Sequence, residues 1–510
     1  MPNLSPLFPN LVAPSRRPAA VPPSARARPV GRAAITNLGC KVNQAEMDHV
    51  ERRLRARGVE IVTDGGAADL HVINTCTVTA VADDKSRRAV RRARRASPAA
   101  TIIVTGCSVG VDGASLAAVD PSARLVANAE KDGLLAEVER LVGPPRPPGG
   151  RPHGPLDAAL PTLAGVEVEG IAGGRNRIDR TRAYVKVQDG CSFFCTYCII
   201  PRARGAERSL APETVLADVR RALAAGHREV VLTGINIGTY DGGRSERGPR
   251  GAHLRAALTL PGLVRRILAE TPVERIRLSS IEPQHVDDDL LAVWTGEGDG
   301  RCLPHVHLPL QSGDDGVLRR MGRRYAAADY LRVVERVRAA IPGVAIHADV
   351  IAGFPSEDHA AFARTIAFLG ALDPAGLHVF RYSARPGTPA TRMAAQVPEA
   401  VRRERATVLL GEAAAARRRF AARAAGGGRT VLFEELADHG DPGAGWIGHA
   451  EDYLVVRAAA PAGRPLAGAI ARVRIDGIDP LDPERAVGRV ERVSAAPAAG
   501  MALPVVPLPG

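Results

Sequence analysis

Lysine is scarce in this chain, although the chain is strongly basic. Lysine and arginine together number 68 against 55 acidic residues, and only four of the 68 are lysine, so arginine carries the formal net charge of +13. Guanidinium groups bind phosphate in a bidentate fork, so the surplus suits a polyanionic partner. A GC-rich genome that encodes arginine and alanine freely explains it equally well. Charge alone therefore leaves a nucleic-acid partner open.

Long apolar stretches are missing as well. No run of 18 apolar residues occurs, and the first 32 residues lack the 7–15-residue apolar stretch of a secretory signal. We therefore expect no membrane association. The same 32 residues contain many prolines and no acid, and we interpret them as a disordered extension or the product of a misplaced start codon. An organelle transit peptide shares this composition and is a third interpretation.

Cysteine is also rare, and its count is odd. Seven cysteines in 510 residues argue against a disulfide framework and favour a reducing compartment. We expect the protein in the cytoplasm.

The chain is too long for one compact core, and domains of about 100–200 residues suggest roughly three folded units. Between residues 33 and 142, the apolar runs AAITNLG, DLHVINT and TIIVTG are separated by helical stretches at 43–57 and 83–96. This rhythm predicts a doubly wound α/β domain. The second helical stretch is a candidate RNA contact or merely a solvated face. Its basic residues are Lys85, Arg87, Arg88, Arg91, Arg92, Arg94 and Arg95.

From residue 181 onward, six strand-like runs alternate with helical or mixed segments: AYVKVQ, EVVLTG, RIRLSS, HVHLPL, AIHADVIAG and GLHVFRYS. Parallel strands with helical crossovers predict a partial (β/α)6 barrel, whose working face lies at the carboxyl ends of the strands. An arginine-rich helix at 398–425 and three alternating segments then predict a small all-β barrel. The parts we expect are a disordered extension at 1–32, an α/β domain at 33–142, a linker at 143–178, the partial barrel at 179–425, the small barrel at 426–493 and a disordered tail at 494–510.

Three cysteines lie in the loop GCSFFCTYCIIP after the first barrel strand, at Cys191, Cys195 and Cys198. Three thiolates from one loop can hold a 4Fe–4S cluster and leave its fourth iron open for S-adenosylmethionine (SAM). Electron transfer from such a cluster to SAM releases a 5′-deoxyadenosyl radical. A zinc site would need a fourth ligand, and the next candidates, His227 and Cys302, lie far along the sequence. Buried inert cysteines are the other alternative.

Three further cysteines end three predicted strands of the amino-terminal domain. Cys40 follows AAITNLG, Cys76 follows DLHVINT, and Cys107 follows TIIVTG. The carboxyl ends of parallel strands meet at one edge of a sheet, so these thiols can converge. We predict a second three-cysteine cluster with one open iron, and chance placement is the alternative. Cys302 has no partner left over, and we expect no role for it.

Six cysteines in this order resemble the methylthiotransferase family of radical SAM enzymes, from about Ala33 to about Val493. The resemblance implies an auxiliary 4Fe–4S cluster on Cys40, Cys76 and Cys107, whose open iron binds the sulfur to be inserted. It implies a second 4Fe–4S cluster on the later loop, two uses of SAM, a carboxyl-terminal TRAM barrel that binds RNA, and no catalytic residue beyond the cluster ligands. The strand-end residues that surround SAM in similar enzymes correspond here to Tyr197, Gly234, Asn236, Ser279, Glu282, Gln311 and Gly353.

Within the family, the strings NLGCKVNQAE, NTCTVTAVADDKSRRAVRR, CTYCIIPRARG and VLTGINIGTY resemble the MtaB type. That resemblance implies transfer of a methylthio group to C2 of N6-threonylcarbamoyladenosine, on the 3′ side of the anticodon, in tRNAs that read codons beginning with A. It implies tRNA, an electron donor such as a flavodoxin or ferredoxin, and a sulfur source as partners, and we expect a monomer.

Other functions stay open at this point. Relatives act on isopentenyladenosine in tRNA or on an aspartate of a ribosomal protein, and a non-catalytic iron–sulfur protein that binds RNA would share the basic charge and the small barrel. In that barrel Trp446, His449 and Tyr453 could stack on bases or belong to the core.

Overall fold

The computed structural model describes residues 31–62, 66–142, 181–243, 258–298, 300–437, 445–461 and 465–495. The predicted linker at 143–178 lies outside these residues, as do nearly all of the predicted extension at 1–32 and tail at 494–510. The described chain divides into two compact units. Among the helices of these ranges, none combines the length and apolar character that crossing a bilayer requires.

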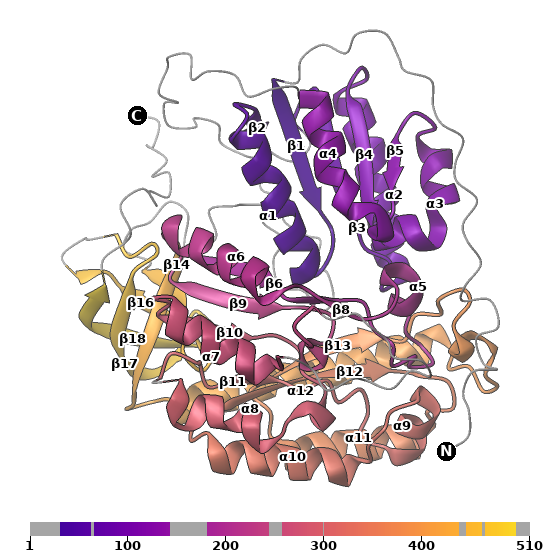
Figure 1. Cartoon of the computed structure of the whole chain (residues 1–510). Helices are drawn as coiled ribbons and strands as arrows, with labels where there is room; N and C mark the ends of the chain where they lie inside the picture. The colour runs from indigo at the N-terminus through magenta and orange to yellow at the C-terminus, as the bar shows by residue number, and fades with distance from the viewer. Residues whose placement is uncertain are drawn as a thin grey trace. The chain divides into compact units, whose positions relative to one another are not determined.

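The first unit is built on a five-stranded parallel sheet with the order β2-β1-β3-β4-β5 (Figure 1). One apolar cluster packs α1 and α4 against the sheet, and another packs α2 and α3 against it. Neighbouring residues of a strand, such as Val72 and Ile73, enter different clusters, so helices cover both faces, as predicted. The elements are β1 (Arg32–Asn37), α1 (Lys41–Arg55), β2 (Glu60–Val62), β3 (Leu70–Thr75), α2 (Ala80–Ala96), β4 (Thr101–Gly106), α3 (Cys107–Val119), β5 (Arg124–Val126), η2 (Asn128–Glu130) and α4 (Lys131–Val142).

Two segments from later in the chain belong to this first unit. Cys191–Ala206 contains α5 (Ile200–Arg204), and Ser383–Met393 contains η6 (Pro389–Arg392). The side-chain amide of Asn128 donates to the carbonyl of Ala203 over 2.8 Å, which fastens α5 to the sheet domain. The unit therefore contains all six cysteines of the two predicted sets.

The second unit contains the six predicted barrel strands as two three-stranded parallel sheets, β10-β9-β6 and β11-β12-β13. Parallel bridges between Ile276 and Cys302 and between Ser280 and His307 connect the two sheets, so the strands follow one another as in a partial barrel. The elements are β6 (Arg182–Lys186), β7 (Gln188–Asp189), β8 (Arg208–Ser209), α6 (Pro212–Ala224), β9 (Glu229–Thr233), η3 (Ile237–Thr239), α7 (Leu260–Glu270), β10 (Arg275–Leu278), η4 (Pro283–His285), α8 (Asp288–Ala292), η5 (Val293–Glu297), β11 (His305–His307), α9 (Asp315–Met321), α10 (Ala327–Ala340), β12 (Ala345–Ala352), α11 (His359–Leu372) and β13 (Gly376–Arg381).

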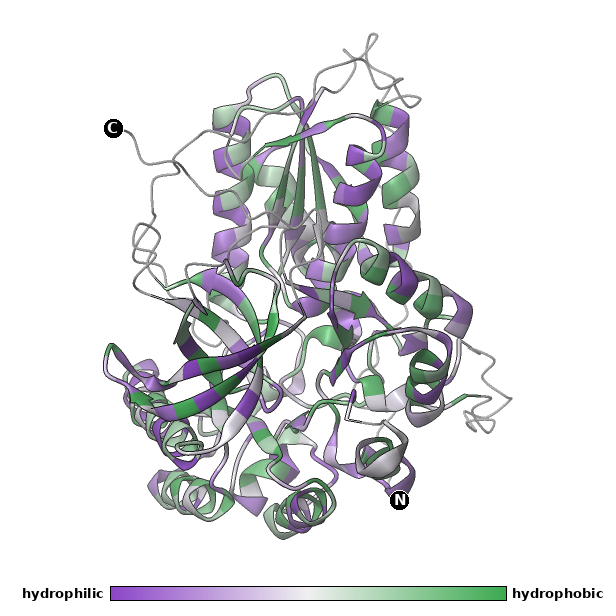
Figure 2. Ribbon diagram, turned by 90° about the vertical axis from the view of Figure 1, so that its left-hand side faces the viewer, coloured by the Kyte–Doolittle hydropathy of each residue, from purple (hydrophilic) through white to green (hydrophobic). Residues whose placement is uncertain are grey.

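A closed all-β barrel ends the second unit, with the order β14-β15-β16-β18-β17. Figure 2 shows its strands alternating between hydrophilic and hydrophobic residues, the pattern of a barrel with one buried face. Trp446 is buried in its core, which decides between the two roles expected for this residue. The elements are α12 (Glu399–Arg423), β14 (Gly428–Leu436), β15 (Trp446–Ala450), β16 (Val455–Ala459), β17 (Ile470–Asp479) and β18 (Asp482–Ala495).

A buried ion cluster joins the small barrel to the partial barrel. Glu229 is fully buried and accepts hydrogen bonds from Arg275 and Arg277, both over 2.8 Å. Burial alone would raise the pKa of Glu229, but the two guanidinium groups hold that pKa well below its ordinary value. Arg275 and Arg277 also donate to carbonyl groups of the small barrel, including those of Thr430 and Ala450.

Tyr453 completes this junction. Its ring stacks on His305 with centroids 4.6 Å apart and lies 4.8 Å from the guanidinium carbon of Arg277. These contacts engage the ring inside the second unit and favour the core role, which is one of the two alternatives for Tyr453.

We predict that Glu229→Gln destabilises the second unit by about 3–5 kcal/mol, because it leaves two buried guanidinium groups without their carboxylate. Urea unfolding followed by circular dichroism measures the effect. Glu213→Gln is the matched control, since Glu213 pairs with Arg266 on the exposed surface and its loss should leave the transition in place. Equal transitions for the two variants would contradict the prediction.

Candidate functional site

The first three cysteines lie at the carboxyl ends of three adjacent strands. Cys76 directly follows β3, Cys107 directly follows β4 as the first residue of α3, and Cys40 caps the start of α1 after β1. Gly106 makes the approach of Cys107 possible. Its φ is +100°, and a Cβ at this position would lie 2.3 Å from the carbonyl oxygen of Thr75.

The structure places the three thiols at one edge of the sheet, after the adjacent strands β1, β3 and β4, where the strand-end pattern predicted them. The pKa of the Cys76 thiol is raised to about 12, chiefly by burial and in smaller part by the neighbouring thiols of Cys107 and Cys40. Burial also raises the pKa of Cys107, and Cys40 again adds to the effect. None of the three forms a disulfide, and Cys40 is exposed while the other two are buried.

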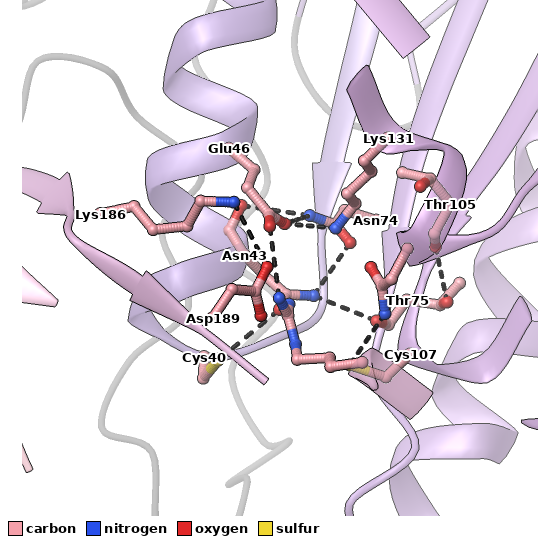
Figure 3. Close-up of polar contacts among 12 residues, drawn as sticks. Cys40, Asn43, Glu46, Asn74, Thr75, Thr105, Cys107, Lys131, Lys186 and Asp189 are labelled. Atoms are coloured by element: carbon pink, nitrogen blue, oxygen red, sulfur yellow. Dashed lines mark hydrogen bonds and ion pairs between the residues drawn. The ribbon is translucent and has the colours of Figure 1, made fainter. Parts of the chain in front are cut away.

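Two buried cations lie beside Cys107 and lower its pKa against the effect of burial: Arg204 and Lys131. Both form ion pairs with Glu46, and Arg204 also donates to the side chain of Asn43. In Figure 3 the side chains of Asn43, Glu46 and Lys131 point toward one another beside Cys107. Two cations and one carboxylate leave one formal positive charge next to the thiols.

The carbonyl group of Cys76 is held by a second buried network. Ser108 Oγ lies 2.7 Å from the Cys76 carbonyl oxygen and 3.1 Å from a carboxylate oxygen of Asp83. Arg385, from the late segment of the first unit, pairs with Asp83 and donates to Thr77 Oγ1 over 2.6 Å. The loop that carries Cys76 is therefore fixed from two sides.

The later cysteine loop is half-buried at each of its three thiols, Cys191, Cys195 and Cys198. Its backbone turns tightly, with a hydrogen bond from Cys198 N to Cys195 O over 2.9 Å. Phe194 lies in the left-handed region at φ 52° and is 39% exposed.

Arg202 and Thr196 attach the loop to the late segment. Arg202 donates to Pro386 O over 2.8 Å, and Ala390 N donates to Thr196 O over 2.9 Å. Tyr197, an expected SAM contact, lies in this loop and is half-buried. Within the first unit, the loop segment is therefore attached both to the late segment and, through Asn128, to the sheet domain.

In the second unit, the remaining expected SAM contacts lie at or beyond the carboxyl ends of β9 to β12. After β9, Gln188 Oε1 accepts hydrogen bonds from Ile235 N over 2.9 Å and Asn236 N over 3.0 Å. Gly234 is required there, because a Cβ would lie 2.9 Å from both oxygens of Gln188. Packing alone therefore explains the glycine at position 234. The sequence did not predict that Gln188 holds this segment in place.

Asn236 and Ser279 carry a different signal. Both side chains are buried, and within the described part of the chain the amide oxygen and nitrogen of Asn236 and the hydroxyl of Ser279 have no hydrogen-bond partner. Buried polar atoms normally find partners, so unsatisfied ones at the working end of a barrel indicate a ligand.

The other three residues have partners inside the fold. Glu282 pairs with Arg323, and burial raises the pKa of its carboxyl group. The backbone of Gln311, at φ +73°, exchanges hydrogen bonds with β12. Gly353 lies at φ +74°, where a Cβ would lie 2.2 Å from Cγ of Arg402. Turn and packing requirements explain these positions without a ligand.

Comparisons with known proteins fit both units. Residues 32–128 match the family described as Uncharacterized protein family UPF0004, and residues 185–369 match the Radical SAM superfamily. The fold and the cysteine loop thus define a radical SAM enzyme, whose cofactors are SAM and 4Fe–4S clusters.

Curated relatives narrow the class. A Bacillus subtilis protein described as threonylcarbamoyladenosine tRNA methylthiotransferase MtaB is 34% identical over 430 residues, which cover 83% of this chain and 89% of that protein. A Chlamydia pneumoniae protein of the same description is 36% identical and covers 74% and 81% of the two chains. A Novosphingobium aromaticivorans protein described as tRNA-2-methylthio-N(6)-dimethylallyladenosine synthase is 35% identical, with 73% and 79% covered. The chain belongs to the methylthiotransferase family of radical SAM enzymes, which confirms the resemblance drawn from the six cysteines, and MtaB-type proteins are among the relatives it matches.

We predict that Cys40 and Cys76 react with an alkylating reagent at very different rates in the cluster-free protein. At pH 8 iodoacetamide should modify the exposed Cys40 rapidly, while Cys76 stays largely protonated because its pKa is raised to about 12. The rate at Cys76 should climb about tenfold per pH unit above pH 8, as the thiolate fraction rises. Peptide mass spectrometry measures both rates. Equal rates at Cys40 and Cys76 at pH 8 would refute the described burial.

Proposed function

We propose that this protein transfers a methylthio group to C2 of N6-threonylcarbamoyladenosine, on the 3′ side of the anticodon, in tRNAs that read codons beginning with A. The observation that carries the proposal is the pair of three-cysteine sets within one compact unit of a methylthiotransferase-family chain. The four MtaB-like strings and the relatives of that description support the choice of nucleoside.

The donor sets fit two iron–sulfur clusters. Cys191, Cys195 and Cys198 would hold the SAM-binding cluster, and Cys40, Cys76 and Cys107 the auxiliary one. Bound there, the clusters and SAM supply a 5′-deoxyadenosyl radical and a site for the sulfur to be inserted. Metal binding displaces the protons of thiols, so the raised pKa values of Cys76 and Cys107 make loading of the auxiliary set dependent on pH.

The chain's own residues prepare these sites. Arg204 and Lys131 offset the negative charge that three thiolates and a cluster would bring into a buried place. The network of Arg385, Asp83 and Ser108 fixes the backbone at Cys76. In the second unit, Asn236 and Ser279 would hydrogen-bond SAM, since their buried polar atoms are the ones that lack partners in the described chain.

The second candidate nucleoside is isopentenyladenosine in tRNA. The Novosphingobium relative supports it, because its identity of 35% lies between the 34% and 36% of the two MtaB relatives. A ribosomal-protein aspartate is a weaker candidate, since the two kinds of relative described above are both named for tRNA. An electron donor such as a flavodoxin or ferredoxin, a sulfur source, a monomeric state and a cytoplasmic location belong to the proposal as well.

We predict that the two cysteine sets have different functions, which alanine variants distinguish. Replacing Cys191, Cys195 and Cys198 by alanine should abolish both 5′-deoxyadenosine and the methylthio product. Replacing Cys40, Cys76 and Cys107 should abolish the product but leave 5′-deoxyadenosine formation, and each triple variant should lose about four irons. Nucleoside mass spectrometry of reconstituted, anaerobic reactions with SAM, dithionite and tRNA measures both outputs.

Cys302→Ala is the matched control, because Cys302 is buried in the partial barrel and should be dispensable. A deletion strain supplies the independent check. Undiminished methylthio-threonylcarbamoyladenosine in that strain would show that the assigned nucleoside is wrong, and loss of methylthio-isopentenyladenosine would support the second candidate.

We predict that the exposed arginines of α2 contribute to tRNA affinity. Arg87 and Arg94 of this helix form ion pairs with Asp84 and Asp120. Four other arginines of the helix are exposed to solvent. Changing those four to glutamine should weaken binding and flatten the slope of log Kobs against log salt, by up to about 0.7–0.9 for each phosphate that the protein no longer binds. The four are Arg88, Arg91, Arg92 and Arg95.

The control for this helix removes the same charge elsewhere. Four arginines of α6, α7 and α10 pair with acidic neighbours, and their replacement by glutamine should leave the salt slope nearly unchanged. They are Arg220, Arg265, Arg266 and Arg332. Identical slopes for both quadruple variants in filter binding would exclude α2 as a specific contact.

A further inference from the structure

The last three strands of the partial barrel carry a row of polar side chains on one face. Along β11, β12 and β13, apolar residues such as Val306, Ile346 and Val379 join the core cluster that includes Val334 of α10 and Leu369 of α11. Successive residues of a strand point to opposite faces, so the alternate positions face away from these helices, toward the barrel interior. Five of those positions are histidine or aspartate, whereas Ala345, Ile351, Gly376 and Phe380 occupy the others. The five are His305, His307, His347, Asp349 and His378.

Three of these side chains, those of His307, Asp349 and His378, are joined by hydrogen bonds, and the row below means these three. His307 Nε2 lies 2.7 Å from Asp349 Oδ1, and His378 Nδ1 lies 3.0 Å from the same oxygen. Ser280 Oγ lies 2.7 Å from His307 Nδ1 and extends the row to the strand end of β10. The row thus fixes the orientation of both imidazoles.

The side chain at one end of the row is exposed to solvent. The side chain of His307 is 10% exposed and that of Asp349 is 18% exposed, but that of His378 is 40% exposed. His378 therefore presents a ring that Asp349 orients and that a ligand can still reach.

The row lies close to the working end of the strands. Gln311 N donates to the carbonyl of Asp349 over 2.7 Å, and Gln311 O accepts from Ile351 N. These bonds place the row next to the carboxyl-terminal end of the strands, the end at which this barrel architecture carries its chemistry.

The two candidate nucleosides demand opposite surroundings. A threonylcarbamoyl group carries a carbonyl, a hydroxyl and a carboxylate, and each needs a hydrogen-bond partner once it leaves water. An isopentenyl group offers no such partner and would cover the second ring nitrogen of His378 without a hydrogen bond, because only Nδ1 of that ring is bonded to Asp349. Sites that hydrogen-bond a substrate group strongly reject an analogue that lacks it. A polar row is thus a reason to select the first substituent.

We propose that His378 binds the carboxylate-bearing N6 substituent of the substrate adenosine, and that Asp349 and His307 position its ring. The inference rests on the proposed function, because it explains how the same site would choose between the two nucleosides. It adds a substituent-binding site in the barrel interior to the cysteine and SAM sites.

The experiment measures binding and turnover separately with reconstituted holoenzyme. Anticodon stem-loops carrying threonylcarbamoyladenosine, isopentenyladenosine or plain adenosine are titrated by fluorescence anisotropy, and methylthiolation is followed by mass spectrometry. The wild type should bind the threonylcarbamoyl loop most tightly. His378→Phe should weaken that complex by about 10- to 100-fold, the loss of one hydrogen bond to a charged group, and leave the plain loop unchanged.

Two variants guard against misfolding. His378→Asn keeps a hydrogen-bond donor and should recover much of the lost affinity, and His359→Ala removes an exposed histidine of α11 as the matched control. Iron content and thermal unfolding confirm that each variant is folded. His378→Asn also provides the readout if His378→Phe does not fold.

Each result decides between the ideas. Equal affinity of the wild type for all three loops, or an unchanged ranking in His378→Phe, would overturn the inference, whichever loop is methylthiolated. Absence of turnover on the threonylcarbamoyl loop would instead overturn the proposed function. One ring nitrogen each of His307 and His378 and one carboxylate oxygen of Asp349 lie within 4.8 Å of one another, which is close enough to hold a metal ion. Zinc or manganese at one equivalent, lost in His378→Phe without a change in loop ranking, would replace the inference with a metal site.

Discussion

Strands of a parallel sheet all end at the same edge, and both compact units of this protein depend on that constraint. In the first unit it brings together three thiols that are widely separated in sequence. In the second unit it lines up the segments after β9, β10, β11 and β12, where the buried atoms of Asn236 and Ser279 lack partners among the described residues. Neither site needs a contiguous motif, because the sheet supplies the convergence.

Placing ionisable groups at buried edges has a cost that the fold offsets with opposite charges. Desolvation raises the pKa of Cys76 and Cys107, and the cations beside Cys107 act in the other direction. The same balance recurs at Glu229, where two arginines outweigh desolvation. Arginine is well suited to this work, since its guanidinium stays charged when it is buried. The abundance of arginine thus has a structural share besides any contact with nucleic acid.

Local patterns predicted much of this structure. Six apolar runs gave the six strands of the partial barrel, and three cysteines at strand ends gave the convergence of thiols, because both follow from periodicity and sheet geometry. The strand β18 escaped detection, since Asp482, Glu484 and Arg485 give its first half no apolar alternation. The contact of Arg204 with the surroundings of Cys107 also escaped, because nothing local links two residues of separate segments.

The barrel histidines show a different limit. The alternation of His305, Val306 and His307 predicted a strand, yet it could not say which face the helices would cover. Only the packing of α10 and α11 against the apolar set assigns the polar set to the interior. The extent of the ion cluster at Glu229 depends likewise on which carbonyl groups of the small barrel meet Arg275 and Arg277.

The two cations beside Cys107 are chemically unequal. The guanidinium of Arg204 is a permanent charge, whereas burial lowers the pKa of Lys131, so its ammonium group is the one of the two that can release a proton. In a chain that uses arginine almost everywhere, one of its four lysines occupies this buried position. The surroundings of the thiols therefore combine a guanidinium whose charge is fixed with an ammonium group that burial brings closer to its neutral form.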